Sequence, residues 1–316
     1  MEAFPEYTVG FYNLENLFDT KDDPELLDDD FTPRGFKRWT RRRYRNKLYK
    51  LGRAIAHMGQ GSQSPFPVLL GVAELENRRV LEDLLRTEWL LGSGLELVHY
   101  DSPDERGIDT GLLYHRDHFT PDSHQAIPLR VYEVDGRRDF TRDILHVSGR
   151  LNGERVHVLV NHWPSRRDGD DATAHKRLSA AETLLAFMER VASEEPDPNF
   201  LVMGDFNDGP FSDSIRHLLG AAPLHNPMEG LLGPERGSAN YKQSWMLFDQ
   251  ILLSNSFLHP APNTHSFAGA NIFDPKFLKE WSEPFKGKPF RTYAGRNYLG
   301  GYSDHFPVYV RLRYHP

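Results

Sequence analysis

The segment Leu201-Val-Met-Gly-Asp205-Phe-Asn207-Asp208 holds the pattern that decides the fold: a short apolar run followed directly by carboxylates and an amide. Apolar runs of this length are typical of buried strands, so the polar side chains are expected at a strand end. The pattern recurs in Val9-Gly-Phe-Tyr-Asn13, Leu69-Leu-Gly-Val-Ala-Glu74, Val158-Leu-Val-Asn-His162 and Gly301-Tyr-Ser-Asp304-His305.

One polar group after one strand carries little information, because an Asp-x-Asn or Asp-His pair more often forms a turn or a helix cap. Glu74 and Glu76 would likewise suit the start of a helix over Arg78–Arg86, where the helix dipole favours acids. Five such groups in one chain are more informative, since loops at strand ends carry functional residues on a rigid scaffold. The set therefore predicts one shared site.

The rest of the chain alternates between strand and helix patterns, with helical spacing clearest over Thr173–Ala192 and Tyr44–Met58. Ile144–Leu151 and Val156–Val160 flank Asn152-Gly153, a dipeptide typical of two-residue hairpin turns. A hairpin implies antiparallel pairing, so the predicted class is α/β with mixed or antiparallel sheets. Further strands are predicted at Val9–Tyr12, Pro67–Val72, Gly111–Tyr114, Phe200–Met203, Phe248–Leu253 and Phe306–Leu312, and irregular loops at Leu224–Gln243 and Ala261–Tyr298.

Composition excludes several classes of protein. The 316 residues include no cysteine, which rules out disulfides, thiolate metal sites and a cysteine nucleophile. No apolar run approaches the roughly 20 residues of a membrane helix. We expect a soluble chain that folds as one domain over residues 1–316, because no segment resembles a linker. The cytoplasm is favoured, with a secreted or periplasmic location open if a signal peptide has been removed, and no feature indicates a protein partner.

The residue types narrow the chemistry of the predicted site. Carboxylate and amide oxygens such as those of Glu74, Asp205 and Asn13 are ligands for magnesium, manganese or calcium rather than zinc. The neighbouring His162 and His305 can transfer a proton or stabilise charge near neutral pH. Hydrolysis of a phosphate ester uses this combination, in which a metal ion offsets negative charge and a carboxylate activates water.

Six motifs follow one another along nearly the whole chain: Phe11-Tyr-Asn-Leu-Glu-Asn-Leu-Phe18, Gly71-Val-Ala-Glu-Leu-Glu-Asn77, Val160-Asn-His-Trp-Pro-Ser165, Met203-Gly-Asp-Phe-Asn-Asp208, Phe248-Asp-Gln-Ile-Leu-Leu253 and Ser303-Asp-His-Phe-Pro307. In this order they resemble the endonuclease/exonuclease/phosphatase superfamily, whose members include deoxyribonuclease I and neutral sphingomyelinases. The resemblance implies a deoxyribonuclease I-like, four-layer α/β/β/α sandwich of two mixed β-sheets with helices outside. It also implies a site at one edge of the sheets.

The resemblance assigns roles to the oxygen-bearing residues. Glu74 looks like the main metal ligand, supported by Asn13 and Asp304, for Mg²⁺, Mn²⁺ or Ca²⁺. Asp205 resembles the residue that activates or orients water, and Asn207 resembles its positioning neighbour.

Two histidines complete the implied site. His305 matches the histidine that contacts the scissile phosphate, and Asp249 matches the carboxylate that fixes its tautomer. His162 occupies a position that is histidine in deoxyribonuclease I but tyrosine in the apurinic-site enzymes, whose Tyr-x-Pro-Asn run is here His162-Trp-Pro-Ser165. This departure argues against abasic-site repair. Asp109 is either a further orienting partner of His162 or a turn carboxylate.

A basic segment supplies the main clue to substrate. Between Arg34 and Lys50 there are nine Lys or Arg residues and no acid, interleaved with aromatic residues. On a chain with a formal net charge of −7, this segment is the best candidate for contact with a phosphate backbone. A helix whose basic face is merely solvated is the alternative. Nearer to His162 in the sequence, the candidates for clamping phosphate oxygens are Arg166, Arg167 and Arg177.

Three functions agree with these observations. The first is a divalent-metal-dependent phosphodiesterase, a nuclease that hydrolyses the DNA or RNA backbone, with nucleic acid as its substrate. The second is the same chemistry on a phospholipid head group or an inositol or sugar phosphate. The third is a catalytically silent module that binds phosphates or a partner. Retention of every expected acid, amide and histidine argues against this third function.

Overall fold

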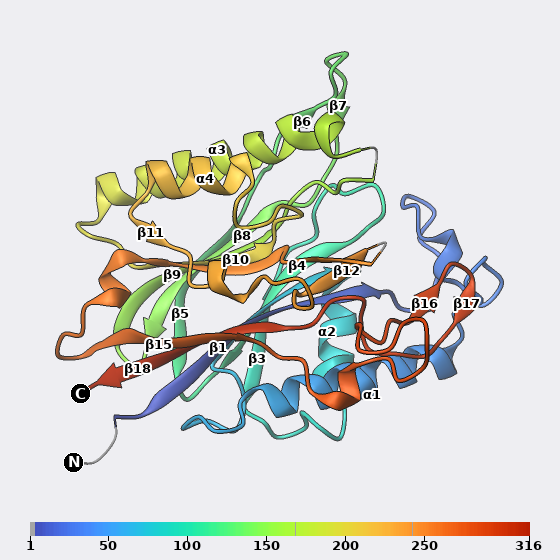
Figure 1. The fold of residues 1–316 in the computed structure, drawn as a ribbon, viewed down its shortest axis with the longest axis horizontal. Helices are drawn as coiled ribbons and strands as arrows, with labels where there is room; N and C mark the ends of the chain where they lie inside the picture. The colour runs from blue at the N-terminus through green and yellow to red at the C-terminus, as the bar shows by residue number, and fades with distance from the viewer. Residues whose placement is uncertain (1–3, 168, 242) are drawn as a thin grey trace.

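The computed structural model describes residues 4–316 except residues 168 and 242. Two six-stranded sheets pack face to face, and Figure 1 shows helices over both outer faces. The predicted four-layer α/β/β/α sandwich with two mixed β-sheets is therefore confirmed. The helices are α1 (Arg41–Met58) and α2 (Arg78–Leu85) on one side, and α3 (Asp170–Glu194) and α4 (Asp213–Ala221) on the other.

The first sheet has the strand order β15-β18-β1-β2-β4-β3. Strands β1 and β2 run parallel, while the other neighbours pair antiparallel. The first and last strands of the chain, β1 and β18, lie side by side in this sheet. Its strands are β1 (Glu6–Leu17), β2 (Leu69–Leu75), β3 (Leu95–His99), β4 (Asp109–His115), β15 (Thr264–Ile272) and β18 (Val308–His315).

The second sheet has the order β11-β14-β10-β9-β8-β5 and repeats the same plan. Strands β9 and β10 run parallel, and their other neighbours pair antiparallel. The carboxyl ends of a parallel pair meet at one edge, so each sheet presents one such edge to the site. The strands are β5 (Phe119–Ile127), β8 (Ile144–Leu151), β9 (Glu154–His162), β10 (Phe200–Asp205), β11 (Leu224–His225) and β14 (Asp249–Ser254).

Short elements form the loops around this edge and on the helical faces. The two-stranded ribbons are β6 (Val131–Tyr132) with β7 (Arg138–Asp139), β12 (Ala239–Tyr241) with β13 (Ser244–Met246), and β16 (Tyr293–Ala294) with β17 (Asn297–Tyr298). The 3₁₀ turns are η1 (Asp29–Phe31), η2 (Glu229–Leu231), η3 (Asn255–Leu258) and η4 (Lys276–Leu278).

Alternation along the strands divides the apolar core into two clusters. On β10, Leu201 and Met203 belong to the cluster between the two sheets, whereas Phe200 and Val202 belong to the cluster under α3 and α4. Successive side chains of a strand point to opposite faces, so a strand buried on both faces carries a continuous apolar run. Such runs were visible in the sequence for this reason. None of the helices in the described part of the chain has the length and apolar character needed to cross a membrane.

Two sequence predictions about local structure have different outcomes. The hairpin is confirmed, because β8 and β9 pair antiparallel around Asn152 and Gly153, whose φ values are 46° and 96°. The prediction that Ala261–Tyr298 is irregular is wrong, because β15 lies within it and pairs with β18. β15 is an edge strand with several half-exposed residues and a bulge between Phe267 and Gly269, so it lacks a continuous apolar run.

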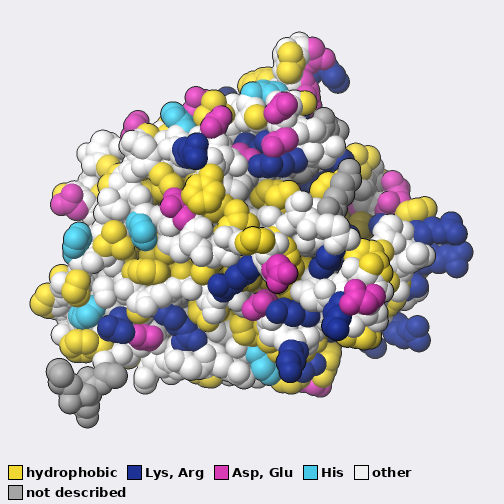
Figure 2. Space-filling model, viewed as in Figure 1, with side chains coloured by type: hydrophobic (Ala, Val, Ile, Leu, Met, Phe, Trp, Pro, Cys, Tyr) yellow, Lys and Arg dark blue, Asp and Glu magenta, His cyan; other side chains and the backbone are white. Residues whose placement is uncertain are grey.

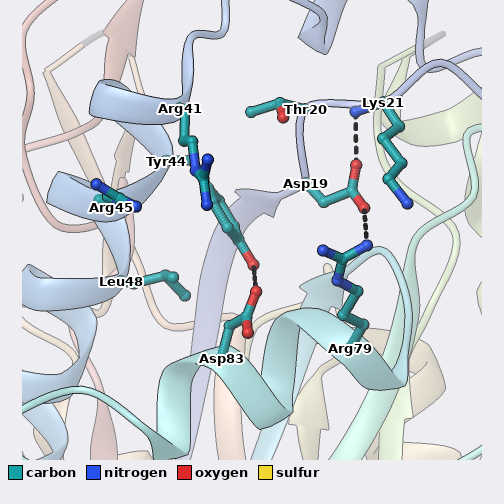
Figure 3. A pocket seen from close by; sticks show the side chains of 9 residues that line it. All are labelled: Asp19, Thr20, Lys21, Arg41, Tyr44, Arg45, Leu48, Arg79 and Asp83. Atoms are coloured by element: carbon teal, nitrogen blue, oxygen red, sulfur yellow. Dashed lines mark hydrogen bonds and ion pairs between the residues drawn. The ribbon is translucent and has the colours of Figure 1, made fainter.

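Helix α1 carries the second part of the basic segment, from Arg41 to Lys50, along the outside of the first sheet. Thr40 caps its start, accepting a hydrogen bond from Arg43 N, and the first turn contains only arginines and no acid. Tyr44 on the buried side donates to Asp83 of α2 over 2.9 Å. Figure 3 shows Arg41 and Arg45 beside this contact, where a pocket of about 460 Å³ opens between α1, α2 and the loop after β1.

Charge is unevenly distributed over the surface. Figure 2 shows Lys and Arg side chains gathered at the right edge of the molecule, the end at which Figure 1 places β16, β17 and the loop before α1. The acidic stretch Asp19–Asp30 lies at the same end and is largely exposed, although Asp19 and Asp28 are buried.

Candidate active site

Three neighbouring strands of the second sheet bring His162, Asp205 and Asp249 side by side. Asp205 at the end of β10 is the register partner of His162 on β9 and of Asp249 on β14. Side chains of register partners point to the same face of a sheet. All three side chains are buried, with exposed fractions of at most 3%.

Irregularities in the first sheet bring Asn13 and Glu74 to the same group of side chains. The pairing of β2 with β1 shifts register after Asn13. The pairing of β2 with β4 shifts register after Ala73, at Glu74. Glu74 has a φ of 60°, and Glu15 and Asn16 have φ values of 50° and 54°. Residues other than glycine rarely adopt this left-handed backbone conformation. Positions strained in this way cluster at functional sites. A bulge re-aims a side chain that a regular strand would direct elsewhere.

The two sheets meet at a small group of polar atoms. Asn13 Nδ2 donates to Glu74 Oε1 over 3.3 Å and to Asp205 Oδ2 over 3.0 Å. His162 Nε2 lies 3.9 Å from each of the same two carboxylate oxygens. Asn16 N donates to the other Glu74 oxygen over 2.9 Å. Two carboxylates thus converge on one amide and one imidazole, which is the grouping that the sequence predicted.

Burial sets the charges of this group. Burial raises the pKa of Asp205 to about 6, against the opposing effect of His305. Burial, with Arg142 and Arg106 nearby, lowers the pKa of His162 well below its usual value, so the ring is neutral at pH 7. Its Nδ1 is buried and has no hydrogen-bond partner among the described residues. The predicted alternative that Asp109 orients His162 is wrong, since Asp109 accepts from His99 Nε2 and from Ser102.

His305 and Asp249 form a hydrogen-bonded pair. His305 Nδ1 lies 2.6 Å from Asp249 Oδ2, and the Asp249 side chain is fully buried. Burial alone would lower the pKa of His305, but the carboxylate of Asp249, with Asp205 and Asp304, raises that pKa well above its usual value. His305 is therefore a cation at neutral pH, and its Nε2 lies 3.9 Å from Asp205 Oδ2.

Asp304 lies at the open side of the site. Arg291 Nη2 donates to Asp304 Oδ2 over 2.7 Å. Burial would raise the pKa of Asp304, yet His305 and Arg291 together hold it below its ordinary value. Asp304 also lines a pocket of about 260 Å³, together with Arg291, Phe285 and Lys288. Asp304 is thus an ionised carboxylate between the buried group and a small cavity.

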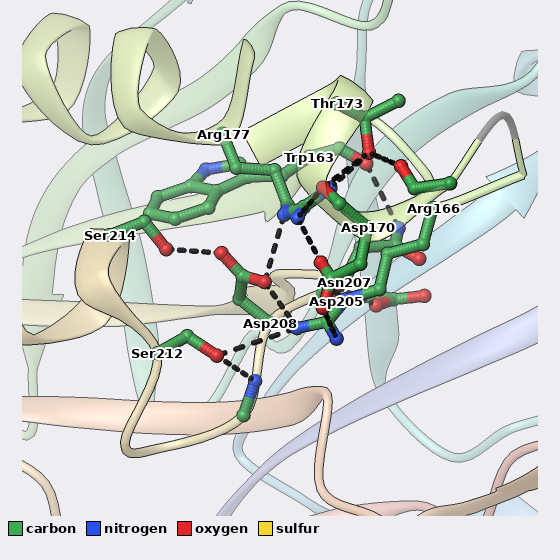
Figure 4. A network of polar contacts seen from close by, with 12 residues as sticks. Trp163, Arg166, Asp170, Thr173, Arg177, Asp205, Asn207, Asp208, Ser212 and Ser214 are labelled. Atoms are coloured by element: carbon green, nitrogen blue, oxygen red, sulfur yellow. Dashed lines mark hydrogen bonds and ion pairs between the residues drawn. The ribbon is translucent and has the colours of Figure 1, made fainter. Parts of the chain in front are cut away.

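The three arginines predicted to clamp phosphate have different surroundings. Arg177 is 1% exposed, and its guanidinium contacts Asp208, Asp170 and Thr173 in the network of Figure 4. Arg177 is therefore not free to bind phosphate, because it is buried and paired carboxylates enclose its charge. Arg166 shares Asp208 and also donates to Asn207 O over 2.6 Å.

Asn207 and Arg167 occupy the rim of the site. Asn207 has a φ of 50°, its backbone N–H donates to Asp205 Oδ1 over 2.9 Å, and its side chain donates to Trp163 O over 2.9 Å. The backbone and side chain of Asn207 therefore both hold the end of β10 in place. Arg167 is exposed and lines a pocket of about 330 Å³ with Arg106 and other residues.

Sequence reasoning missed several residues that shape the site. Arg106 and Arg142 act on His162 through their charge, and Arg291 acts on Asp304. Glu15, for which the motifs suggested no role, accepts hydrogen bonds from Thr292 N and Tyr293 N and lies 3.7 Å from the buried Lys47. No local pattern marks these residues, because each acts through a partner far away in the chain.

The donor set fits a hard divalent ion. Glu74 and Asp205 bring two carboxylates to within hydrogen-bonding distance of Asn13 Nδ2, and the adjacent His162 is neutral. Carboxylate oxygens are ligands of the type that suits Mg²⁺, Mn²⁺ or Ca²⁺. Ligand atoms of Asp205, Asp249 and His305 also lie within 4.8 Å of one another. In that trio, however, Asp249 engages Nδ1 of His305, and the protonated ring has no lone pair on Nε2 to offer a metal ion.

A family model described as the endonuclease/exonuclease/phosphatase family matches residues 8–314. The chain belongs to this family. Enzymes of the endonuclease/exonuclease/phosphatase family are generally hydrolases of phosphoester bonds that depend on divalent metals, and the carboxylate and histidine group described above agrees with that chemistry. A search of curated protein sequences finds no match.

Solved structures of other family members share the fold. A mannosyl-6-phosphatase from Bacteroides thetaiotaomicron is 16% identical, with 98% of this chain and 100% of that chain covered and a TM-score of 0.59. The human Nocturnin catalytic domain with bound sulfate is 13% identical, with 98% and 94% covered and a TM-score of 0.60. Truncated TDP2 from Caenorhabditis elegans is 14% identical, with 98% and 97% covered and a TM-score of 0.58. Identities this low establish the common fold alone.

Proposed function

We propose that this chain is a divalent-metal-dependent phosphodiesterase that hydrolyses the backbone of DNA or RNA. The observation that carries the proposal is the meeting of Asn13 and Glu74 from one sheet with His162 and Asp205 from the other, beside the His305–Asp249 pair. A phosphoester hydrolase needs an anionic ion site, a base for water and a cationic donor for oxygen. These residues supply all three.

Glu74, with Asp304 on the open side, would hold the ion. Asn13, whose Nδ2 donates to Glu74 and Asp205 and whose Oδ1 accepts from Glu15 N, would orient the two carboxylates. A bound Mg²⁺ or Mn²⁺ would polarise the phosphoryl oxygen and offset the negative charge that develops on it. Near neutral pH the Asp205 carboxylate is ionised and can accept a proton from the attacking water, since its pKa is raised only to about 6. The N–H of Asn207 holds Asp205 in position for this task.

The histidines lie beside Asp205 and can act on the oxygens of the phosphate. Protonated His305 presents Nε2 to the site and can donate a proton or a hydrogen bond to the leaving oxygen or to a phosphoryl oxygen. Neutral His162 offers Nε2 as a hydrogen-bonding group next to Glu74 and Asp205. Exposed Arg167, with Arg166 beside it, is the candidate for binding non-bridging phosphate oxygens.

Support for nucleic acid over smaller esters comes from the basic segment that precedes and begins α1. Most of its Lys and Arg side chains are exposed on an otherwise acidic chain. A polyanionic backbone gains affinity from each such contact through release of counterions. A sugar phosphate or an inositol phosphate would need far fewer positive charges.

The test is turnover by purified protein with and without added Mg²⁺ or Mn²⁺. We expect metal-dependent cleavage of plasmid DNA or RNA and of bis(p-nitrophenyl) phosphate, reduced at least about 10³-fold in His162→Ala and Asp205→Ala. The control is His217→Ala on the exposed face of α4, which should retain full activity. Undiminished, metal-dependent activity in both site variants would overturn the proposed roles.

A sugar-phosphate monoesterase is the second candidate. The pocket beside Asp304, at about 260 Å³, has room for a small organic group rather than a duplex. Release of inorganic phosphate from a sugar phosphate, with nucleic acid left intact, would favour this candidate. Metal-dependent binding of phosphates without turnover of any ester would favour a silent binding module.

A further inference from the structure

A basic pocket of about 510 Å³ opens at the end of the molecule that carries the active site. Loop residues before α1, the first turn of α1 and the β16–β17 hairpin together form its walls. None of the described residues that line it is acidic. The lining consists of Arg34, Gly35, Phe36, Lys37, Arg38, Arg43, Arg296, Asn297 and Tyr298, and we call it the basic pocket.

Hydrogen bonds between its walls hold the basic pocket open without a ligand. Tyr293 Oη donates to Lys37 O over 3.0 Å, and Lys37 Nζ donates to Gly295 O over 2.6 Å. Arg43 Nη1 donates to Lys37 O over 2.6 Å, and its guanidinium lies 4.4 Å from the centre of the Tyr298 ring. A preformed site avoids part of the entropy lost on binding.

Three of the five positive charges have no hydrogen-bond or ion-pair partner among the described residues. Arg34, Arg38 and Arg296 are exposed, and none makes a hydrogen bond or ion pair through its side chain with any residue the structure describes. Arg38 also has a φ of 48°, which is unfavourable for an arginine. Uncompensated charge and local strain in one pocket indicate a function other than stability.

The start of α1 adds to this conclusion. Its first turn contains Arg41, Arg42 and Arg43, and these cations face the positive end of the helix dipole. Such an arrangement weakens the isolated helix, whereas an anion bound nearby would be attracted by both the side chains and the helix end. The sequence therefore favours anion binding over helix stability at this point.

Aromatic side chains border the positive charge. Phe36 is 57% exposed and lines the basic pocket, so its ring is accessible to a ligand held there. Unpaired nucleobases stack on such rings, which duplex DNA does not allow because its bases are already stacked. Charge and exposed aromatic surface together match a single-stranded polynucleotide.

The basic pocket is joined to the active site through short stretches of chain. Arg291, which holds Asp304, lies two residues before the β16–β17 hairpin that carries Arg296. Glu15, two residues after Asn13, accepts from the backbone of Thr292 and Tyr293 at the base of the same hairpin. Figure 2 shows Lys and Arg side chains at this end of the molecule. A strand bound in the pocket can thus continue toward Asp304.

We infer that the basic pocket is an exosite for single-stranded DNA or RNA, which holds the backbone of a substrate whose scissile phosphate lies beside Glu74 and His305. This inference rests on the proposed function and extends it by naming the substrate as a strand several nucleotides long. An anionic membrane is a poorer match, because the surface is a walled hollow rather than a plane and because it leads into the site.

The test compares Arg34→Gln/Arg296→Gln with the matched control Arg190→Gln/Arg216→Gln, whose arginines are exposed on α3 and α4. On a single strand of about 30 nucleotides, the pocket variant should raise KM at least about tenfold at low salt, and the control should not. The slope of log KM against log salt should fall by about 1.4, because each lost phosphate contact removes about 0.7. Turnover of bis(p-nitrophenyl) phosphate should be unchanged in both variants.

A second variant tests the aromatic contribution. Phe36→Ala should weaken binding of single strands about tenfold and leave duplex binding unchanged. An equal loss for duplex and single strands would overturn the single-strand assignment. An unchanged salt slope in Arg34→Gln/Arg296→Gln would overturn the exosite. The exosite would also be overturned if this variant lost binding to phosphatidylserine vesicles but kept the parental KM for the oligonucleotide.

Binding measured by fluorescence anisotropy without metal separates the two proposals. If the parent protein cleaves no ester but binds single strands through Arg34 and Arg296, the proposed function fails and the exosite remains. If bis(p-nitrophenyl) phosphate is hydrolysed while anisotropy shows no dependence on these arginines, the exosite fails and the phosphodiesterase remains.

Discussion

His305 Nδ1 lies 2.6 Å from Asp249 Oδ2, and this contact joins residues 56 positions apart in the chain. Asp249 is fully buried, and its other carboxylate oxygen has no hydrogen-bond partner among the described residues. The carboxylate therefore acts mainly on one ring. It holds the proton on Nδ1 and directs Nε2 toward Asp205.

Replacing this carboxylate by an amide should remove the charge of His305 while keeping the shape of the site. In Asp249→Asn we expect the pKa of His305 to fall, because burial is then opposed only by the weaker effects of Asp205 and Asp304. The kcat for a chromogenic phosphodiester should fall about 10²- to 10⁴-fold at pH 7. Asp117→Asn, at a side chain 73% exposed, is the matched control and should leave kcat unchanged. Equal kcat values in the two variants would refute the pairing.

Glu74 should matter for metal affinity rather than for the fold. It is half-buried at a bulge, and only one of its oxygens is fully engaged, by Asn16 N. In Glu74→Gln we expect the Kd for Mn²⁺, measured by titration calorimetry, to rise at least about tenfold, since a neutral amide is a weaker ligand for a hard ion. Thermal stability should hardly change. The exposed Glu88→Gln should bind Mn²⁺ as the parent does, and a Glu74→Gln protein with unaltered affinity would place the ion elsewhere.

Much of the site was visible in the sequence because its residues follow buried strands directly. Asn13, Glu74, His162 and Asp205 each end or follow an apolar run, and the fold brings those strand ends together. The left-handed conformation of Glu74 was not visible, because the bulge follows from pairing with two neighbouring strands.

The surroundings of several charged residues near the candidate site could not be predicted from the sequence, for one physical reason. The sequence does not reveal whether an arginine near the site is free or paired with carboxylates. In the structure, Asp170 and Asp208 enclose Arg177. The pairing of Arg291 with Asp304, and that of Lys47 with Glu15, join segments that only the tertiary fold brings into contact. Local periodicity carries no information about such pairs.

Acid should destabilise the protein through two stacked histidines. His146 Nε2 lies 3.0 Å from His157 Nδ1 beneath α3, and burial, with the charge of His157, lowers the pKa of His146 to about 3. A lowered histidine pKa means that the folded state prefers the neutral ring. Stability is therefore fully present above the unfolded pKa of about 6.5 and is lost as pH falls from there toward 3.

The expected loss from His146 is at most about 4 kcal/mol over this range. Urea denaturation at a series of pH values measures it. His146→Phe should show a shallower decline below pH 6.5 than the parent, whereas His217→Phe on the exposed face of α4 should show the parental decline. Parallel curves for His146→Phe and the parent would mean that this histidine does not contribute.

The buried pair of Lys47 and Glu15 should stabilise the wall between the active site and the basic pocket. Lys47 Nζ lies 3.7 Å from Glu15 Oε2, both side chains are buried, and Lys47 also donates to Thr292 Oγ1 over 2.5 Å. Burial raises the pKa of Glu15 to about 7 and lowers that of Lys47, so each charge depends on the other.

Lys47→Met removes one charge and leaves the other buried without a counter-ion. We expect it to lower the free energy of unfolding by about 3–5 kcal/mol, and Glu15→Gln/Lys47→Met to recover part of this loss, because the double variant buries no charge. Urea denaturation of the parent, both single variants and the double variant gives the coupling energy. The exposed Lys286→Met controls for the substitution itself. Additive losses in the double variant would show that the two charges do not interact, in which case the loop at Thr292 is held by its hydrogen bonds alone.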